Sequence, residues 1–178
     1  VNAYLVWDPQ TRHAISFDTG TSCQSMLDFL ASENLTLKRA FITHTHQDHL
    51  ADLDKLLEIT GATGYGSAIE NPLGLKGLCH GDGLVHDHLR IRVLGTHGHT
   101  PGGLSYYITG LKYPVVVTGD ALFAGSMGGA PRAFQEALQN NQQHLMTLPD
   151  ETIICPGHGP VSTVGEEKAH NPFFPALK

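Results

Sequence analysis

The segment Thr43-His44-Thr45-His46-Gln47-Asp48-His49 carries four side chains that can bind a metal ion within six residues. It lies between a predicted strand and a predicted helix. On a regular strand His44 and His46 would share one face, whereas Asp48 and His49 could not both join them. A loop that wraps around an ion can bring all four together. The spacing therefore favours a metal site over a histidine-rich surface loop.

Four short motifs elsewhere in the chain carry further histidine and aspartate candidates. They are Phe17-Asp18-Thr19-Gly20, Gly98-His99-Thr100-Pro101-Gly102, Gly119-Asp120 and Pro156-Gly157-His158-Gly159. With the histidine segment, in this order and over nearly the whole chain, they resemble the metallo-β-lactamase superfamily. The resemblance implies an α/β (α+β) fold, the four-layer αββα sandwich, with the site along one edge of its two sheets.

The resemblance also implies a role for each candidate residue. The implied ligands are His44, His46 and His99 for one ion, Asp48, His49 and His158 for a second ion, and Asp120 as the bridge between them. Asp18 would support these ligands without binding metal. Imidazoles with carboxylates suit zinc, which is the expected ion, and also iron or manganese. Two such ions about 3.5–4 Å apart can share a hydroxide nucleophile. Asp48 is expected to orient it, so Asp48 and Asp120 are the predicted catalytic residues.

Within the superfamily, Gly119-Asp120-Ala121-Leu122-Phe123 resembles the bridging motif of the glyoxalase II branch, which hydrolyses thioesters of glutathione. Asp120 argues against the true lactamases and His46 against the flavodiiron proteins. Gly129, Pro131 and Pro160 stand where that branch usually has side chains that contact glutathione, and no counterpart of its C-terminal helical domain is expected. We therefore expect a dinuclear hydrolase of a small ester, thioester or lactone, with substrate-binding residues that the sequence does not identify.

Two alternatives from other functional classes remain open. The first is a mononuclear iron dioxygenase acting on glutathione persulfide, which would use His44, His99 and Asp120 as a two-histidine, one-carboxylate site. The second is a non-catalytic, metal-stabilised binding module. A lost ligand would mark such a module, and every position of the superfamily's ligand motifs is filled here.

The remaining histidines are given structural interpretations. The chain has 12 histidines. His86-Asp87-His88 repeats the metal-like spacing but is predicted to be a solvent-exposed hairpin turn. His97 is expected to lie at the surface or to support a ligand. No function is assigned to the isolated histidines His13, His80, His144 and His170.

Composition limits the partners and the compartment. The formal net charge is −6 and the basic residues are scattered, which argues against nucleic acid. No apolar run approaches the roughly 20 residues of a membrane span, and no signal peptide is expected. The 3 cysteines lack a Cys-x-x-Cys pair and favour a reducing cytoplasm. We expect one domain over residues 1–178 and a small-molecule substrate. Because the sequence starts at Val1 and not at a methionine, we expect a chain that is trimmed, processed or part of a longer protein.

Periodicity and turn residues predict the elements that position these side chains. Predicted strands cover 3–7, 14–17, 37–43, 89–94, 104–108, 114–118 and 152–155. Predicted helices run from a Ser22 cap to about Glu33, over 51–59, from Pro131 to about Leu148 with a core stripe that begins at Phe134, and over 165–170. Two glycine-rich stretches, 61–83 and 125–129, are expected to line the substrate pocket, and the second should border the site after Asp120.

Overall fold

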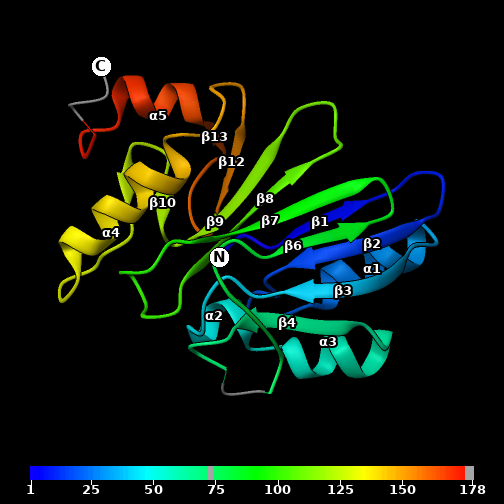
Figure 1. The fold of residues 1–178 in the computed structure, drawn as a ribbon. Helices are drawn as coiled ribbons and strands as arrows, with labels where there is room; N and C mark the ends of the chain where they lie inside the picture. The colour runs from blue at the N-terminus through cyan, green and yellow to red at the C-terminus, as the bar shows by residue number, and fades with distance from the viewer. Residues whose placement is uncertain (72–73, 175–178) are drawn as a thin grey trace.

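The computed structural model describes residues 1–71 and 74–174, and this part of the chain forms two β-sheets that face each other (Figure 1). The first sheet has the strand order β1-β2-β3-β4-β5, with bounds Tyr4–Trp7, His13–Phe17, Thr36–Phe41, Thr63–Ser67 and Lys76–Leu78. The strands β1 and β2 are antiparallel, and every later neighbour pair in this sheet is parallel. Parallel strands therefore end at the same edge, where β2 and β3 deliver Asp18 and the histidine segment.

The second sheet has the strand order β13-β12-β9-β8-β7-β6. The bounds, in that order, are Ser162–Thr163, Ile153–Pro156, Val115–Gly119, Leu104–Thr109, Leu89–Gly95 and Gly83–His86. A separate hairpin joins β10 (Leu122–Phe123) to β11 (Ser126–Met127) directly after Asp120. The parallel pair β12 and β9 ends in the motifs of His158 and Asp120, so these two side chains leave the sheet side by side.

Helices cover the outer face of each sheet (Figure 1). The first sheet packs against α1 (Gln24–Ser32) and α3 (Leu53–Thr60), while the short α2 (Gln47–Leu50) lies in the histidine segment. The second sheet packs against α4 (Phe134–Asn140), the π-helical turn η1 (Asn141–Leu145) and α5 (Val164–His170). The predicted four-layer αββα sandwich is confirmed.

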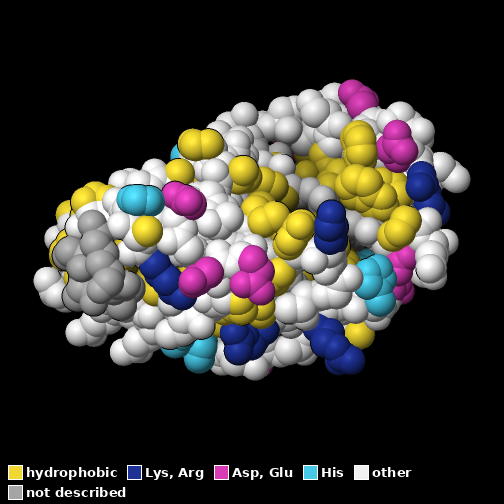
Figure 2. All heavy atoms as spheres, turned by 90° about the horizontal axis from the view of Figure 1, so that it is seen from above, with side chains coloured by type: hydrophobic (Ala, Val, Ile, Leu, Met, Phe, Trp, Pro, Cys, Tyr) yellow, Lys and Arg dark blue, Asp and Glu magenta, His cyan; other side chains and the backbone are white. Residues whose placement is uncertain are grey.

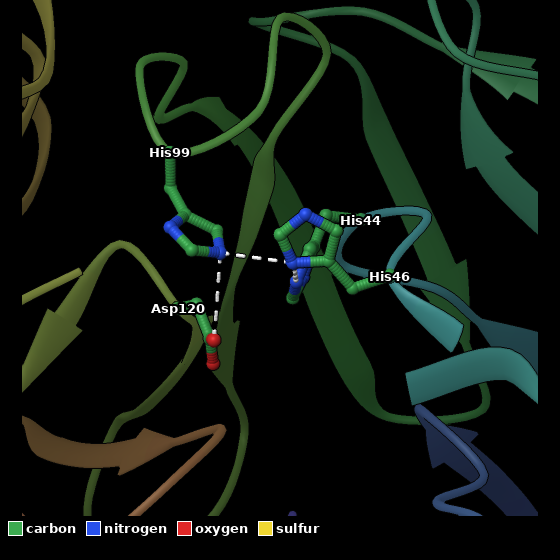
Figure 3. Close-up of side chains that lie close together, drawn as sticks. All are labelled: His44, His46, His99 and Asp120. Atoms are coloured by element: carbon green, nitrogen blue, oxygen red, sulfur yellow. Dashed lines mark hydrogen bonds and ion pairs between the residues drawn. The ribbon is translucent and has the colours of Figure 1, made fainter. Parts of the chain in front are cut away.

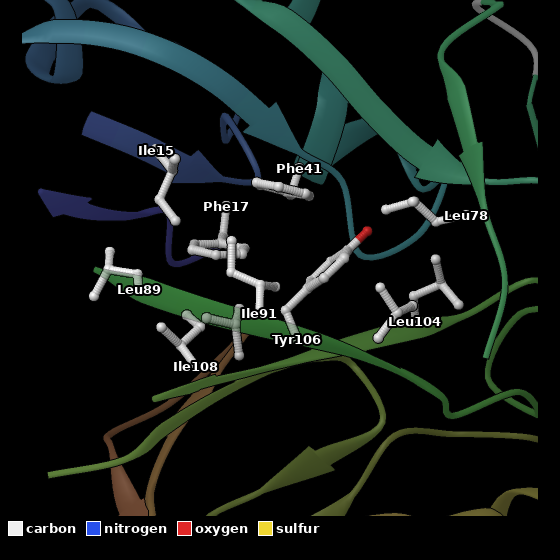
Figure 4. Close-up of a cluster of buried hydrophobic side chains, with 11 residues drawn as sticks. Ile15, Phe17, Phe41, Leu78, Leu89, Ile91, Leu104, Tyr106 and Ile108 are labelled. Carbon is white, nitrogen blue, oxygen red and sulfur yellow. The ribbon is translucent and has the colours of Figure 1, made fainter. Parts of the chain in front are cut away.

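The hydrophobic core between the two sheets fixes the end of β3, after which the histidine segment begins. Phe17, Phe41 and Tyr106 are fully buried, and their rings lie 5.2–5.4 Å apart (Figure 4). Such aromatic contacts are each worth about 0.5–1.5 kcal/mol beyond the area they bury. The hydroxyl of Tyr106 donates a hydrogen bond of 2.7 Å to the backbone oxygen of Ile42. This bond crosses from one sheet to the other immediately before the histidine segment, which is thereby held against the second sheet.

The predicted strands are all found, with ends shifted by one or two residues. The sequence predicts no strand or helix in the glycine-rich stretch 61–83, but this stretch supplies β4, β5 and the start of β6. Residues 72–73 lie outside the described part. The alternation of apolar and polar side chains that identifies a strand is hidden in this stretch. Gly64, Gly66 and Gly77 have no side chain, and they pack closely against neighbouring side chains.

Two predicted helix starts were wrong. Pro131 lies in a turn closed by the Ala133 N–H and the Ala130 oxygen, and α4 begins only at Phe134. Phe134 is 42% exposed, so it lies outside the core stripe. Ser22 does not cap α1: the cap position is Cys23, whose N–H donates instead to Asp52.

In the described part of the chain, none of the helices combines the length and the apolar character that a bilayer crossing requires.

Candidate metal centre

Asp18 organises the histidine segment from the end of β2. Its backbone adopts the left-handed region with φ of 54°, which turns its carboxylate back toward β3. One oxygen accepts the Thr43 N–H at 2.8 Å, and the other lies 2.8 Å from Nδ1 of His49. All three residues are buried. Asp18 therefore holds the segment through Thr43 and His49 and lies outside both groups of candidate ligands.

A first group of ligand atoms comes from His44, His46, His99 and Asp120 (Figure 3). Nδ1 of His46 lies 3.1 Å from Nε2 of His44 and 3.0 Å from Nε2 of His99. Oδ2 of Asp120 lies 3.5 Å from Nε2 of His99. The four atoms are all within 4.8 Å of one another, which is the spacing of ligands around one ion.

A second group of ligand atoms comes from Asp48, His49 and His158. Oδ2 of Asp48 lies 3.2 Å from Nε2 of His158 and 3.9 Å from Nε2 of His49. Asp120 also faces this group, since its two oxygens lie 3.3 Å from Nε2 of His49 and 3.6 Å from Nε2 of His158. The carboxylate of Asp120 therefore lies between the two groups. All seven predicted ligands come together.

Glycine backbone packs directly against the bridging aspartate. A Cβ atom on Gly157 would lie 2.2 Å from Oδ1 of Asp120, and one on Gly128 would lie 1.7 Å from its backbone oxygen. Gly119, with φ of 51°, would carry a Cβ 2.4 Å from Oγ1 of Thr43. These contacts leave no space for a side chain, so close packing against Asp120 and Thr43 requires glycine at positions 119, 128 and 157.

The charges of the site favour a cation. Burial is the largest influence on His44 and, together with His49, lowers the pKa of its imidazole to about 2. For His49, burial opposes the charged form, but the contacts with Asp120 and Asp18 outweigh it and raise the pKa to about 9. For Asp120, burial acts to raise the pKa, and the contact with His49 outweighs it and lowers the pKa. The surroundings of Asp120 thus keep its carboxylate ionised, and burial keeps the imidazole of His44 neutral, the forms in which these two groups bind metal.

The donor set fits a metal centre. Nε2 of His49 and Oδ1 of Asp120 are both buried and lie 3.3 Å apart, yet neither atom has a hydrogen bond of suitable geometry among the described residues. A buried polar atom without a partner is costly unless something binds it. Imidazole nitrogens with carboxylate oxygens suit divalent transition metals. The residues present therefore fit divalent cations, and these atoms point to where the cations would bind.

Hydrogen bonds on the outer nitrogens orient the candidate ligands. Nδ1 of His99 donates to the backbone oxygen of Gly129 at 2.8 Å. Nδ1 of His44 lies 3.0 Å from Oγ1 of Thr43, and Thr43 in turn donates to Asp18. Such partners fix the tautomer that leaves Nε2 free for metal. Sequence reasoning missed Thr43 and Gly129, although Thr43 precedes His44 in the motif and the stretch 125–129 was expected to border the site.

The other histidines lie outside both groups. His86 and His88 flank a hairpin turn as predicted, but the expected exposure of His86 was wrong because it is 5% exposed between the sheet edges. His88 contacts Asp8 through Nδ1 at 2.7 Å. His97 is half-buried, and its backbone oxygen accepts a hydrogen bond from Asn140. Among the described residues, none of these three side chains joins a ligand group.

Comparison with known proteins decides the family. Residues 1–158 match the family model described as the metallo-beta-lactamase superfamily. The chain belongs to the metallo-beta-lactamase superfamily. The superfamily comprises metal-dependent hydrolases, and the described residues carry the matching His/Asp cluster.

Two relatives match the chain over nearly its full length. A probable metallo-hydrolase, YqgX of Bacillus subtilis, is 30% identical over 97% of this chain and 92% of the relative. The hydroxyacylglutathione hydrolase GloC of Haemophilus influenzae is 29% identical over 97% of this chain and 92% of its own. The superfamily relatives of the chain thus include glyoxalase II-like enzymes.

Solved structures share the same fold. The BLEG-1 B3 metallo-beta-lactamase has a TM-score of 0.88 at 28% identity, covering 98% of this chain and 94% of its own. ETHE1 from Myxococcus xanthus has a TM-score of 0.87 at 34% identity, covering 96% and 77%. TTHA1623, solved in a di-iron-bound form, has a TM-score of 0.82 at 29% identity, covering 97% and 94%.

Proposed function

We propose that this protein is a dinuclear metal-dependent hydrolase of a small ester, thioester or lactone. The observation that carries the proposal is the position of Asp120, whose carboxylate lies within 3.6 Å of ligand nitrogens of both groups. A carboxylate shared in this way holds two ions close enough to act on one nucleophile. We further propose zinc as the resident metal, with iron kept open because TTHA1623 is described with two irons.

Bound metal would supply a hydroxide at neutral pH and polarise the carbonyl that is attacked. Residues of this chain would set the position of that hydroxide. His44 and His49 are buried and held through Nδ1, so their Nε2 atoms are fixed on the inner side of the site. Asp48 is more accessible, with 44% of its side chain exposed. It can accept a hydrogen bond from the attacking water and so orient it toward a substrate that enters from solvent.

The surroundings of the site favour a substrate without several negative charges. Among the described residues, no Lys or Arg forms an ion pair or hydrogen bond with any candidate ligand. Phe123 provides an apolar wall, since its ring centre lies 6.1 Å from that of His158. We therefore propose that neutral esters, thioesters or lactones react faster than glutathione thioesters, which carry carboxylates.

A substrate panel on zinc-loaded protein tests the proposal. The panel contains a neutral aryl ester, a lactone, a lactoyl thioester of glutathione and a chromogenic β-lactam, the last because one similar structure is a lactamase. The proposal expects saturable hydrolysis of at least one of the first three. Asp120→Asn should keep less than about a tenth of that rate, a loss of roughly 1.4 kcal/mol or more of transition-state stabilisation. Asp54→Asn, exposed on α3, is the control. Wild-type rates in the Asp120 variant would sink the proposal.

A mononuclear iron dioxygenase is the second candidate. The first ligand group contains the required two histidines and one carboxylate in His44, His99 and Asp120. However, Nδ1 of His46 lies 3.0 Å from Nε2 of His99 and would add a third histidine to the same ion, which departs from the two-histidine, one-carboxylate set. Oxygen uptake by iron-loaded protein with glutathione persulfide would support this candidate. Hydrolysis by the wild type would exclude the further alternative, a non-catalytic binding module.

A further inference from the structure

The hairpin β10–β11 connects the bridging aspartate to two histidines of the site. It runs from Leu122 to Met127, two residues after Asp120 and immediately before Gly128 and Gly129. The backbone oxygen of Gly129 accepts the hydrogen bond from Nδ1 of His99, and Phe123 on the hairpin lies against His158. The position of the hairpin therefore sets the orientation of His99 and one wall of the site.

A buried polar pair on the C-terminal helix holds the tip of this hairpin. Glu167 of α5 is 3% exposed and accepts hydrogen bonds from the Gly125 N–H at 2.9 Å and from Asn171 Nδ2 at 2.7 Å. Asn171 is 0% exposed, and its Nδ2 also donates to the backbone oxygen of Ser126 at 3.0 Å. The hydroxyl of Ser162 donates to the other oxygen of Glu167. The turn of the hairpin and its second strand, β11, are thus tied to α5 and to the cap residue that follows it.

These hydrogen bonds are important because a hairpin with such short strands is not stable by itself. Each of its strands has 2 residues, and isolated two-stranded hairpins are marginal in water even when longer. Leu122 and Met127 are buried and anchor its base. At the tip, the bonds to Glu167 and Asn171 are the polar contacts that join the hairpin to another element in the described chain. In the described part no cation pairs with Glu167, so its burial is compensated by N–H and O–H donors alone.

We propose that Glu167 and Asn171 are positioning residues of the metal centre. They hold the hairpin so that the Gly129 oxygen receives Nδ1 of His99 and directs Nε2 into the first ligand group. The inference rests on the proposed metal centre and is independent of which bond the protein hydrolyses. Loss of an outer hydrogen bond of this kind typically weakens metal binding about 10–100-fold.

The test compares Glu167→Ala with Glu167→Gln on the full chain loaded with zinc. The glutamine amide oxygen can accept from Gly125 and Asn171 while its NH2 group faces Ser162, so this variant preserves the hydrogen bonds without the charge. Two quantities are measured: zinc affinity by chelator competition, and hydrogen exchange of the backbone over residues 121–130. Glu166→Gln is the matched control, because the neighbouring Glu166 has 69% of its side chain exposed and, among the described residues, its carboxylate forms an ion pair with His170 alone.

The expected result is a pair of linked effects. Glu167→Ala should lose exchange protection over 121–130 and bind one of its two zinc ions about tenfold more weakly or worse. Glu167→Gln and Glu166→Gln should resemble the wild type. Should Glu167→Ala fail to fold, Asn171→Ala must show the same two effects. A variant whose hairpin exchanges faster while both zinc ions bind as in the wild type overturns the inference. Wild-type protein that binds no second zinc would instead overturn the proposed function.

Discussion

Nδ1 of His49 lies 2.8 Å from Oδ2 of Asp18, and both side chains are buried. The contact leaves Nε2 of His49 facing Asp120 and Asp48. A carboxylate behind a histidine fixes the ring, selects its tautomer and raises the basicity of the nitrogen that binds metal. The early Asp-x-Gly turn of the sequence is therefore part of the metal centre even though it contributes no ligand.

Asp18→Asn should weaken binding of the ion held by His49 by about 10–100-fold. Asparagine tolerates the left-handed backbone at this position, so the variant should remain folded. It loses the negative charge that stabilises His49 as a ligand. Titration of metal-free protein with zinc, followed by calorimetry, measures the two affinities separately. Asp54→Asn is the control, and equal affinities for Asp18→Asn and the wild type would refute the role of Asp18.

Gly128→Ala and Gly129→Ala should differ sharply although the two residues are adjacent. A Cβ on Gly128 would meet the backbone oxygen of Asp120 at 1.7 Å, whereas a Cβ on Gly129 would have no atom within 4 Å. Gly128→Ala should therefore cost about 1–3 kcal/mol of stability, typical of overpacking, and reduce metal content. Gly129→Ala should match the wild type. Urea unfolding of both variants gives the comparison, and similar stabilities would contradict the packing around Asp120.

Asp8 should contribute to stability in a pH-dependent way at the end of the sheets opposite the ligands. Its contact with His88 is the largest influence and, with the N–H groups of Gln10 and Thr11, lowers the pKa of Asp8 against the opposing effect of burial. A depressed pKa means that the contribution is present above the unfolded value, about 4, and is lost as the pH falls through the lower folded value.

Asp8→Asn should therefore be less stable than the wild type at pH 7, and the difference should shrink below pH 4. Urea midpoints of metal-free protein at several pH values measure this, with chelator present so that the metal centre does not contribute. Asp54→Asn should follow the wild type at every pH. A constant difference between Asp8→Asn and the wild type across the range would show that the charge of Asp8 is not involved.

The residues that gather in the two candidate ligand groups could be predicted from sequence because metal binding restricts both residue type and spacing. His44, His46, Asp48 and His49 are close in sequence, and the motifs of His99, Asp120 and His158 each end or follow a strand that the apolar pattern reveals. The sandwich itself followed from the resemblance of these motifs to a superfamily. Periodicity alone left the choice between α/β and α+β layers open.

The supporting contacts could not be predicted because they join residues far apart in sequence. Glu167 reaches Gly125 across 42 residues, and nothing in the local pattern distinguishes it from the exposed Glu166. The same holds for Asn171 and Ser126, which are 45 residues apart. Pro131 misled for a different reason: proline favours the first turn of a helix, but it also fits the local turn closed by the Ala133 N–H and the Ala130 oxygen, and α4 begins only at Phe134.

Metal content per chain tests the central claim most directly. Wild-type protein and Asp120→Asn are purified without added metal, and zinc, iron and manganese are counted by elemental mass spectrometry against protein concentration. A dinuclear centre bridged by Asp120 predicts about two equivalents in the wild type and about one in the variant. One equivalent of iron in both proteins, or no bound metal in the wild type, would contradict it.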